Sequence, residues 1–359
     1  ALAILRADHY PKATEHIAER IALIERLIAA GYAYESEGSI FFRITEDDDY
    51  GRLSGFDLGQ VRQGERVVSD NYDKEDVRDF VLWKAAKPDE PSWDSPWGAG
   101  RPGWHIECSA MSMKYLGESF DIHCGGVDNI FPHHENEIAQ SESATGKPFV
   151  RYWLHSEHLI VDGEKMSKSL GNQYNLSDLL ERDYAPRALR YLFLSVHYRQ
   201  KLNFTFEAVD TATAALRRID EMRFRLGHAT EQDGVGSAVE EPAERMLRGF
   251  RDALASDLNI SAALASVFGF VKEVNVAIES GPLALGDRAR ALAALGAAAR
   301  VLGVLDPGDW EADDGGDDTA IQDLVDQRDA ARAGRDFAEA DRLREELDAL
   351  DIVIEDTPE

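Results

Sequence analysis

Cysteine, long apolar runs and positive charge are all scarce in this chain of 359 residues. Its two cysteines, Cys108 and Cys124, are too few for a disulfide framework, which indicates a reducing compartment and predicts a cytoplasmic protein. No run of eighteen apolar residues occurs, and the N-terminal residues lack the charged, apolar and cleavage regions of a signal peptide. The composition therefore predicts a soluble protein.

Basic residues are outnumbered, 39 against 67 acidic residues, and the net charge of -28 argues, taken as a whole, against a nucleic-acid partner. The distribution matters more than the total. Basic residues outnumber acidic ones between Arg182 and Arg225, whereas Asp306 to Asp318 contains no basic residue. The sequence thus leaves room for a local basic face, and we interpret the acid excess as a feature of solubility or of a salty cytoplasm.

The first hundred residues predict a mixed α/β arrangement. Residues 14–30 predict a helix that Thr14 caps and Gly31 ends, with isoleucines repeating on one face. Residues 33–44 predict a hairpin with Gly38 in its turn, and Phe80 to Trp83 a buried strand. Charge and glycine between residues 46 and 76 fit an irregular insertion, and residues 88–102 a long ordered loop.

The second half predicts helices. One helical region begins at residues 176–180 and continues through 186–194, and a bundle follows over 206–305 with breaks at 227–236 and 281–282. Asp306 to Asp318 has the composition of a linker. Residues 321–350 return to an amphipathic pattern, for which a solvated helical hairpin is an equally good interpretation.

One short stretch, residues 165–169, carries two lysines three positions apart among small hydroxyl residues. Such a loop can close over a polyphosphate and neutralise charge as a phosphorus–oxygen bond breaks. Lysine and serine loops are more often plain solvated surface, so the pattern alone does not decide. The stretch reads Lys165, Met166, Ser167, Lys168, Ser169.

A metal site is predicted from Cys108, His133 and Glu137. Pro132 is well placed to start a helix, which would put His133 and Glu137 on one face, four positions apart. A thiolate, an imidazole and a carboxylate are ordinary zinc ligands, and three of them leave room for another. On the pattern alone, a buried cysteine beside a helix-capping histidine is the favoured alternative, and the metal site gains its weight from the family resemblance given below. His134 points about 100° away from His133 on a helix, so we expect it to serve the substrate or to support the site.

Three segments, in this order and spacing, resemble the cysteinyl-tRNA synthetase family of class I aminoacyl-tRNA synthetases: residues 100–108, residues 131–137 and the lysine stretch. The resemblance implies an α/β fold, with the second half of a Rossmann-type catalytic domain plus a connective insertion, followed by helical domains. The implied ranges are 1–85 (end of the first catalytic half and insertion), 86–160 (second half), 161–210 (lysine loop and stem-contact region), 211–305 (bundle), 306–320 (acidic linker) and 321–359 (part of a tRNA-binding domain).

The resemblance also implies a reaction. Cysteine is activated by ATP, with Mg²⁺, to cysteinyl adenylate and is then transferred to tRNA(Cys); a zinc ion takes the substrate thiolate and so rejects serine. The implied catalytic residues are Lys165 and Lys168, within an ATP-binding loop that also includes Met166, Ser167 and Ser169. A monomer is expected. The implied zinc ligands are Cys108, His133 and Glu137, and the implied substrate-binding residues are Trp104, His123, Gly126, Asp128 and His134.

The sequence departs from the family pattern in what it does not contain. The His-Ile-Gly-His signature that binds ATP is found nowhere, and the family's first zinc-ligating cysteine has no match. Both are expected before Ala1, and residues 352–359 resemble a family motif cut short. We therefore expect a fragment that lacks on the order of a hundred residues and does not catalyse cysteine-dependent exchange of pyrophosphate into ATP, although weak tRNA binding is expected.

Two other functions fit parts of the sequence. A cysteine ligase with an amino-sugar acceptor, similar to mycothiol ligases, shares the catalytic core, but the helical tail and the sequence Glu135-Asn136-Glu137 favour the tRNA enzyme. A non-catalytic tRNA-binding remnant is the alternative of a different class.

Overall fold

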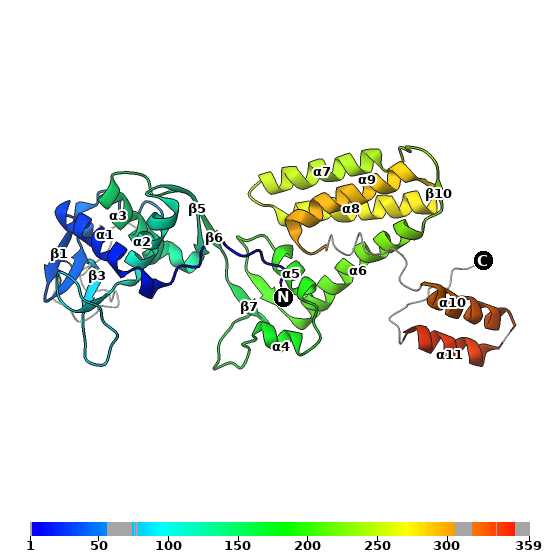
Figure 1. Ribbon diagram of the computed structural model, residues 1–359, viewed down its shortest axis with the longest axis horizontal. Helices are drawn as coiled ribbons and strands as arrows, with labels where there is room; N and C mark the ends of the chain where they lie inside the picture. Colours follow the sequence, from blue (N-terminus) through cyan, green and yellow to red (C-terminus); the bar gives the residue numbers. More distant parts are fainter. Residues whose placement is uncertain are drawn as a thin grey trace. The chain divides into compact units, whose positions relative to one another are not determined.

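The computed structural model describes residues 2–55, 74, 76, 78–305, 318–334 and 336–348, which fall into two compact units, Ala1–Leu295 and Gly296–Glu359 (Figure 1). Much of the expected insertion at 46–76, residues 306–317 of the expected linker and the final motif at 352–359 lie outside the described residues.

The first part of the chain forms an antiparallel sheet of four strands in sequence order. The expected hairpin and the strand at Phe80 are confirmed, and the end of the ordered loop supplies the last strand. Helix α1 packs on this sheet through Leu23, Ile24 and Leu27. The elements are α1 (Ile17–Ala29), β1 (Ala33–Ser36), β2 (Ser39–Phe42), β3 (Phe80–Ala85) and β4 (Gly100–Pro102).

The expected start of the first helix was wrong. Residues Ala13–Glu15 form a separate 3-10 turn, and α1 begins at Ile17 without a side-chain cap from Thr14 or His16. Both ring nitrogens of His16 have other partners, the Lys12 carbonyl and the Tyr115 hydroxyl, so this side chain does not cap the helix. The helix ends where expected, since Gly31 adopts a φ of +88°, which favours glycine.

Next comes a β-α-β unit, which carries the candidate site. Strands β5 (Phe120–Gly126) and β6 (Val150–Ser156) pair in parallel, with helix α3 (Glu135–Thr145) connecting them and helix α2 (Trp104–Leu116) packed on α3. Gly126 lies opposite Ser156, so the carboxyl ends of both strands meet at one edge. Ligands of open α/β sheets bind at this kind of edge.

The lysine stretch follows at a tight hairpin. Strand β7 (Leu159–Val161) pairs antiparallel with β8 (Glu164–Lys165) and parallel with β9 (Leu202–Phe204). The expected helical region at 176–180 and 186–194 is confirmed, and it consists of two helices, α4 (Leu176–Leu180) and α5 (Pro186–Ser195). The break follows from Pro186, because a residue before proline is disfavoured in the helical region and Ala185 is extended.

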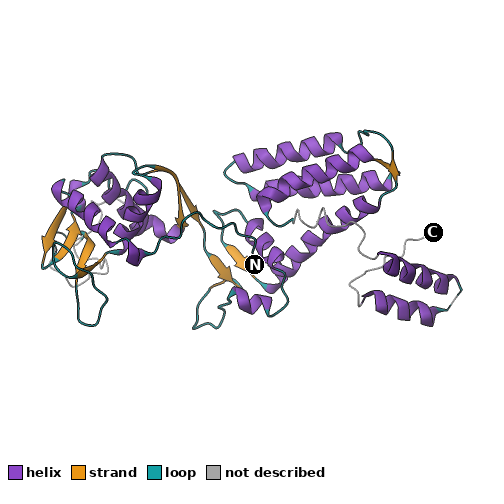
Figure 2. Ribbon diagram, in the orientation of Figure 1, coloured by secondary structure: helices purple, strands orange, loops and turns teal. Residues whose placement is uncertain are grey.

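Helices make up nearly all of the rest (Figure 2). The expected breaks near residues 227–236 and 281–282 are confirmed, and a third, missed break falls at Asp257 and Leu258, which both have positive φ. Asn259 caps the helix after it. The bundle comprises α6 (Phe206–His228), β10 (Glu231–Gln232), α7 (Glu240–Ala255), α8 (Ile260–Glu279), β11 (Leu283–Ala284) and α9 (Leu285–Leu302).

Helix α8 is long and apolar enough to cross a membrane by length and composition alone. Seven of its residues are buried, among them Val267, Phe270 and Val274, and it packs on α6 and α7. These contacts are those of a core helix in a bundle.

The last described elements are α10 (Asp318–Ala333) and α11 (Phe337–Asp348), which pack on each other. The amphipathic pattern after residue 320 therefore forms a helical hairpin, and Leu343 and Leu347 are buried in it.

Candidate functional site

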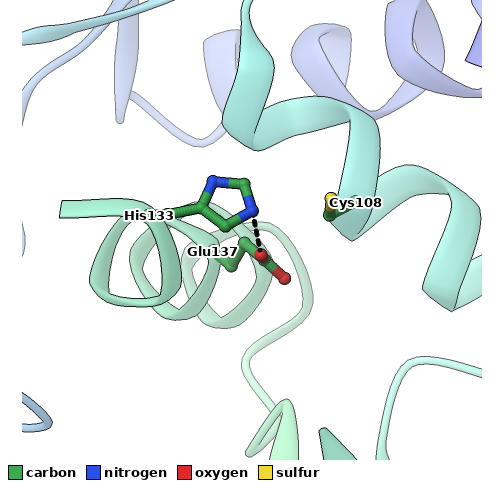
Figure 3. A group of neighbouring side chains, drawn as sticks. All are labelled: Cys108, His133 and Glu137. Carbon is green, nitrogen blue, oxygen red and sulfur yellow. Dashed lines mark ion pairs between the residues drawn. The ribbon is translucent and has the colours of Figure 1, made fainter. Parts of the chain in front are cut away.

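The three predicted metal ligands lie together between α2 and α3 (Figure 3). Cys108 comes from the middle of α2, and Glu137 from the first turn of α3. One ligand atom from each of Cys108, His133 and Glu137 lies within 4.8 Å of the others. His133 belongs to a wider turn, Ile130–His134, that precedes α3, so the helix starts at Glu135 and not at Pro132 as expected.

Glu137 is the centre of this group. Its side chain is fully buried, with Oε1 2.8 Å from Nε2 of His133 and Oε2 3.3 Å from Nε2 of His123. Burial raises the pKa of this carboxyl, and the two histidines lower it by a larger amount. The pKa of Glu137 is therefore below its usual value. Neither oxygen has a donor aligned as in a hydrogen bond. A buried carboxylate left this way is costly, and a cation between these side chains would relieve the cost.

Cys108 is suited to holding a cation only as a thiolate. Without a cation nearby, the pKa of the Cys108 thiol is raised to about 12; burial contributes most, the charges of Glu137 and Glu107 act in the same direction, and Arg20 opposes them. A metal ion next to the sulfur reverses this effect, because a coordinating thiol is deprotonated. The donor set of sulfur, imidazole nitrogen and carboxylate oxygen therefore fits zinc.

A histidine that the sequence analysis missed fixes the orientation of His133. Nδ1 of His105 lies 2.7 Å from Nδ1 of His133, which leaves Nε2 of His133 facing Glu137. Burial, followed by the nearby His133, lowers the pKa of His105 to about 4, so its ring is neutral at physiological pH. A hydrogen bond to the second ring nitrogen commonly orients a metal-ligating histidine, and His105 takes that place here. The available signal was the spacing of His105 and Cys108, three apart on one helix face.

Polar side chains also fix the register of α2 on α3. The side-chain amide of Gln140 donates to the carbonyl of His105 at 2.6 Å and to Oγ of Ser109 at 2.7 Å. Ser141 donates to the same Ser109 oxygen at 2.9 Å. Because Ser109 follows Cys108 and Gln140 lies one turn after Glu137, these bonds set the separation of the two ligands.

The expected substrate residues surround the same point. The indole of Trp104, 58% exposed, stacks on His133 with 4.1 Å between ring centroids. His123 faces Glu137 directly. A Cβ at Gly125 would come within 2.5 Å of the His134 ring, so only glycine lets β5 approach it.

His134 lies closer to Glu137 than the sequence analysis expected. Its Nδ1 lies 2.8 Å from Nε2 of His155, and one of its nitrogens forms, with His123 and Glu137, a second group whose ligand atoms lie within 4.8 Å of one another. Gly126 ends β5, and Asp128 follows in the next turn, 3.9 Å from His158. All five expected substrate residues therefore lie on or beside the β5–α3 connection or at the start of α2.

The lysine loop is ordered by Asn172. Its Oδ1 accepts the backbone N–H of Ser167 at 2.8 Å, and its Nδ2 donates to the carbonyl of Lys165 at 3.2 Å. Lys165 and Lys168 are exposed, and neither has an ion-pair partner among the described residues. Met166 turns inward to line an apolar cavity of about 130 Å³. Within the described part of the chain, no hydrogen bond or ion pair joins this loop to the Cys108 group.

Much of the charge in the expected basic face is already neutralised. Arg187 pairs with Asp220 at 2.7 Å, Arg199 with Asp257 at 2.6 Å and Arg225 with Glu279 at 3.0 Å. A run of arginines in sequence therefore does not make an equally basic surface here.

Comparisons with known proteins agree with this architecture. Family models match three ranges: the tRNA synthetases class I (C) catalytic domain at residues 1–214, the DALR domain at 249–306 and the cysteinyl-tRNA ligase anticodon binding domain at 314–359. A methionyl-tRNA synthetase structure from Mycobacterium tuberculosis, in complex with methionyl-adenylate, has a TM-score of 0.54 at 16% identity, over 84% of this chain and 74% of that one. At this identity the likeness shows the fold alone.

Curated relatives are much more similar. A cysteine–tRNA ligase from Solibacter usitatus is 46% identical over 99% of this chain and 76% of its own length. One from Nitratidesulfovibrio vulgaris strain Hildenborough is 48% identical over 99% of this chain and 78% of its own. The chain thus spans about three quarters of the length of these relatives. On the catalytic match and this identity, the chain belongs to the cysteine–tRNA ligase family of class I aminoacyl-tRNA synthetases.

Proposed function

We propose that the chain acts in the cysteine–tRNA ligase reaction through a zinc site built from Cys108, His133 and Glu137. The buried Glu137 carboxylate carries this proposal, because both of its oxygens lack an aligned donor. One oxygen lies beside His133 and the other beside His123, and the Cys108 sulfur lies within 4.8 Å of the His133 and Glu137 ligand atoms. When bound, zinc would supply a ligand position for the substrate thiolate, and serine would be rejected because its hydroxyl is a poorer ligand.

The surrounding residues would enclose the small side chain of cysteine. Trp104 covers His133 from the solvent side, and His123 and His134 approach Glu137 from β5 and the turn before α3. Their rings would exclude water and hold the thiol in place. Gly126 and Asp128, at the carboxyl end of β5, would hold the amino acid or the adenylate, since ligands of such sheets bind there.

The lysine loop would act on ATP. Lys165 and Lys168 have no competing carboxylate among the described residues, so their charge is available to the phosphates. We propose that residues 165–169 bind ATP with Mg²⁺ and that Lys168 stabilises the pyrophosphate leaving group as the bond to the α-phosphorus breaks.

The match to an anticodon binding domain supports tRNA(Cys) as the acceptor over an amino sugar. We further propose a cytoplasmic monomer with the functional divisions at residues 85, 160, 210, 305 and 320. Strands β3 and β4 pair across the first of these divisions, so the sheet they share would link the insertion to the catalytic half.

Metal analysis tests the zinc site. We expect the full-length protein, after exhaustive dialysis, to retain about one zinc per chain, because the three ligands converge only in the folded state. The 359 residues alone are expected to hold zinc more weakly, because the family's first cysteine ligand has no match in them. Release of zinc on unfolding in urea is expected for the same reason as its retention. A dialysed and folded full-length protein without zinc would overturn the assignment.

A further inference from the structure

A short strap, residues 49–55, lies across the first turn of α3. Three of its backbone N–H groups donate to the carboxylate of Glu135: Gly51 at 3.0 Å, Leu53 at 3.3 Å and Ser54 at 2.8 Å. The Tyr50 hydroxyl donates to Oδ1 of Asn136 at 2.5 Å. The strap is therefore bound mainly by the two residues that immediately precede Glu137.

The side chains of α3 that hold the strap are buried. Glu135 and Asn136 are 1% and 3% exposed, and Tyr50 is 8% exposed. A buried carboxylate is stable only when hydrogen bonds replace its lost hydration, and three backbone donors do so here. Replacing the carboxylate by an amide would set an N–H₂ group against these donors, which would loosen the strap.

The direction of these side chains ties the strap to the candidate metal site. Residues two apart on a helix project about 200° apart, so Glu135 and Glu137 leave opposite sides of the first turn of α3. One side is fixed to the strap by Glu135, while Gln140 fixes the next turn to α2. Contacts on both sides therefore prevent the first turn of α3 from rotating about the helix axis. Such a rotation would change the direction in which the Glu137 carboxylate points.

We propose that Glu135 and Asn136 are positioning residues, which use the strap to aim Glu137 at Cys108 and His133. This inference rests on the proposed function, because it gives the strap a role in zinc binding and in the selection of cysteine. Neither residue would touch the ion or the substrate. A merely structural role for the strap would instead affect folding alone.

The experiment compares Glu135→Gln and Tyr50→Phe with wild-type protein. Arg52→Ala is the matched control, because Arg52 lies in the same strap but is half exposed and pairs with Glu142 instead. The readouts are the rate of zinc transfer to a chromophoric chelator, the urea midpoint, and KM for cysteine and for ATP in the full-length enzyme. We expect zinc release and KM for cysteine to rise roughly 10–100-fold in Glu135→Gln, with KM for ATP unchanged.

Tyr50→Phe removes one hydroxyl and keeps the ring, so it tests the same coupling if Glu135→Gln does not fold. We expect it to shift zinc release and KM for cysteine in the same direction, by about 3–10-fold, and Arg52→Ala to shift neither. Unchanged zinc release and KM for cysteine in the folded variants, with only a lower urea midpoint, would overturn the inference and leave the proposed function standing. Full-length wild-type protein without zinc would overturn the proposed function itself.

Discussion

In the full-length enzyme, Cys108→Ser is expected to lose its zinc during dialysis and to raise KM for cysteine by more than about 100-fold, because a hydroxyl is a far poorer zinc ligand than a thiolate. Cys124→Ser is the matched control. Cys124 is the other cysteine of the chain, and its side chain is exposed on β5.

Zinc content and cysteine kinetics should therefore separate the two variants. If Cys108→Ser kept its zinc and its KM, Cys108 would be no ligand, and the burial of its thiol would have to be explained by packing alone. Equal losses in both variants would point to general damage by thiol replacement.

Lys168→Ala is expected to lower the rate of adenylate formation in the full-length enzyme by about 10²–10³-fold, while the dissociation constant for ATP changes by less than about threefold. Lysine placed near the leaving group acts mainly when charge develops in the transition state. Lys165→Ala should behave similarly but less severely. Pre-steady-state measurement of adenylate formation across ATP concentrations separates the rate from the binding.

The control for this series is Lys272→Ala, on the exposed face of α8. Its removal changes net charge by the same amount and should leave both constants unchanged. Equal losses of rate and ATP affinity in Lys168→Ala would mean that Lys168 stabilises bound ATP and the transition state equally. No loss of either would mean that the loop is solvated surface without a role in ATP binding or catalysis.

The ligand group was accessible to sequence reasoning because its chemistry is compact. His133 and Glu137 are four apart, and Cys108 is one of two cysteines, so spacing suggested a sulfur, nitrogen and oxygen donor set, and the family resemblance decided in its favour. The structure brings these three together. Spacing could not show that His133 lies in a wider turn before α3, since that depends on how Ile130–His134 packs against α2.

Contacts between distant segments were beyond the sequence. Nothing in residues 49–55 indicates that their N–H groups meet Glu135, more than eighty positions later. His105 was missed because its role depends on a 2.7 Å contact with a ring from another element. The break at Asp257 escaped because it contains neither glycine nor proline, and two residues there adopt the left-handed region instead.

Local rules failed where tertiary contacts compete with them. Thr14 is a good cap by type, yet the chain makes a 3-10 turn and α1 starts three residues later. The arginines between 182 and 225 form a basic run, yet several of them pair with acids from other helices, as Arg225 does with Glu279. Helix ends and surface charge are thus the features that pattern alone predicts least well.

The most direct test of the zinc site uses cobalt(II) in place of zinc, because thiolate ligands give cobalt a strong charge-transfer absorption. We expect this absorption in the cobalt protein, its growth when cysteine is added, and no growth when serine is added at the same concentration. The Cys108→Ser protein should show neither the charge-transfer absorption nor its growth when cysteine is added. A cobalt spectrum that does not respond to cysteine, or that responds equally to serine, would contradict the account that Cys108, His133 and Glu137 hold a metal ion that binds the substrate thiolate.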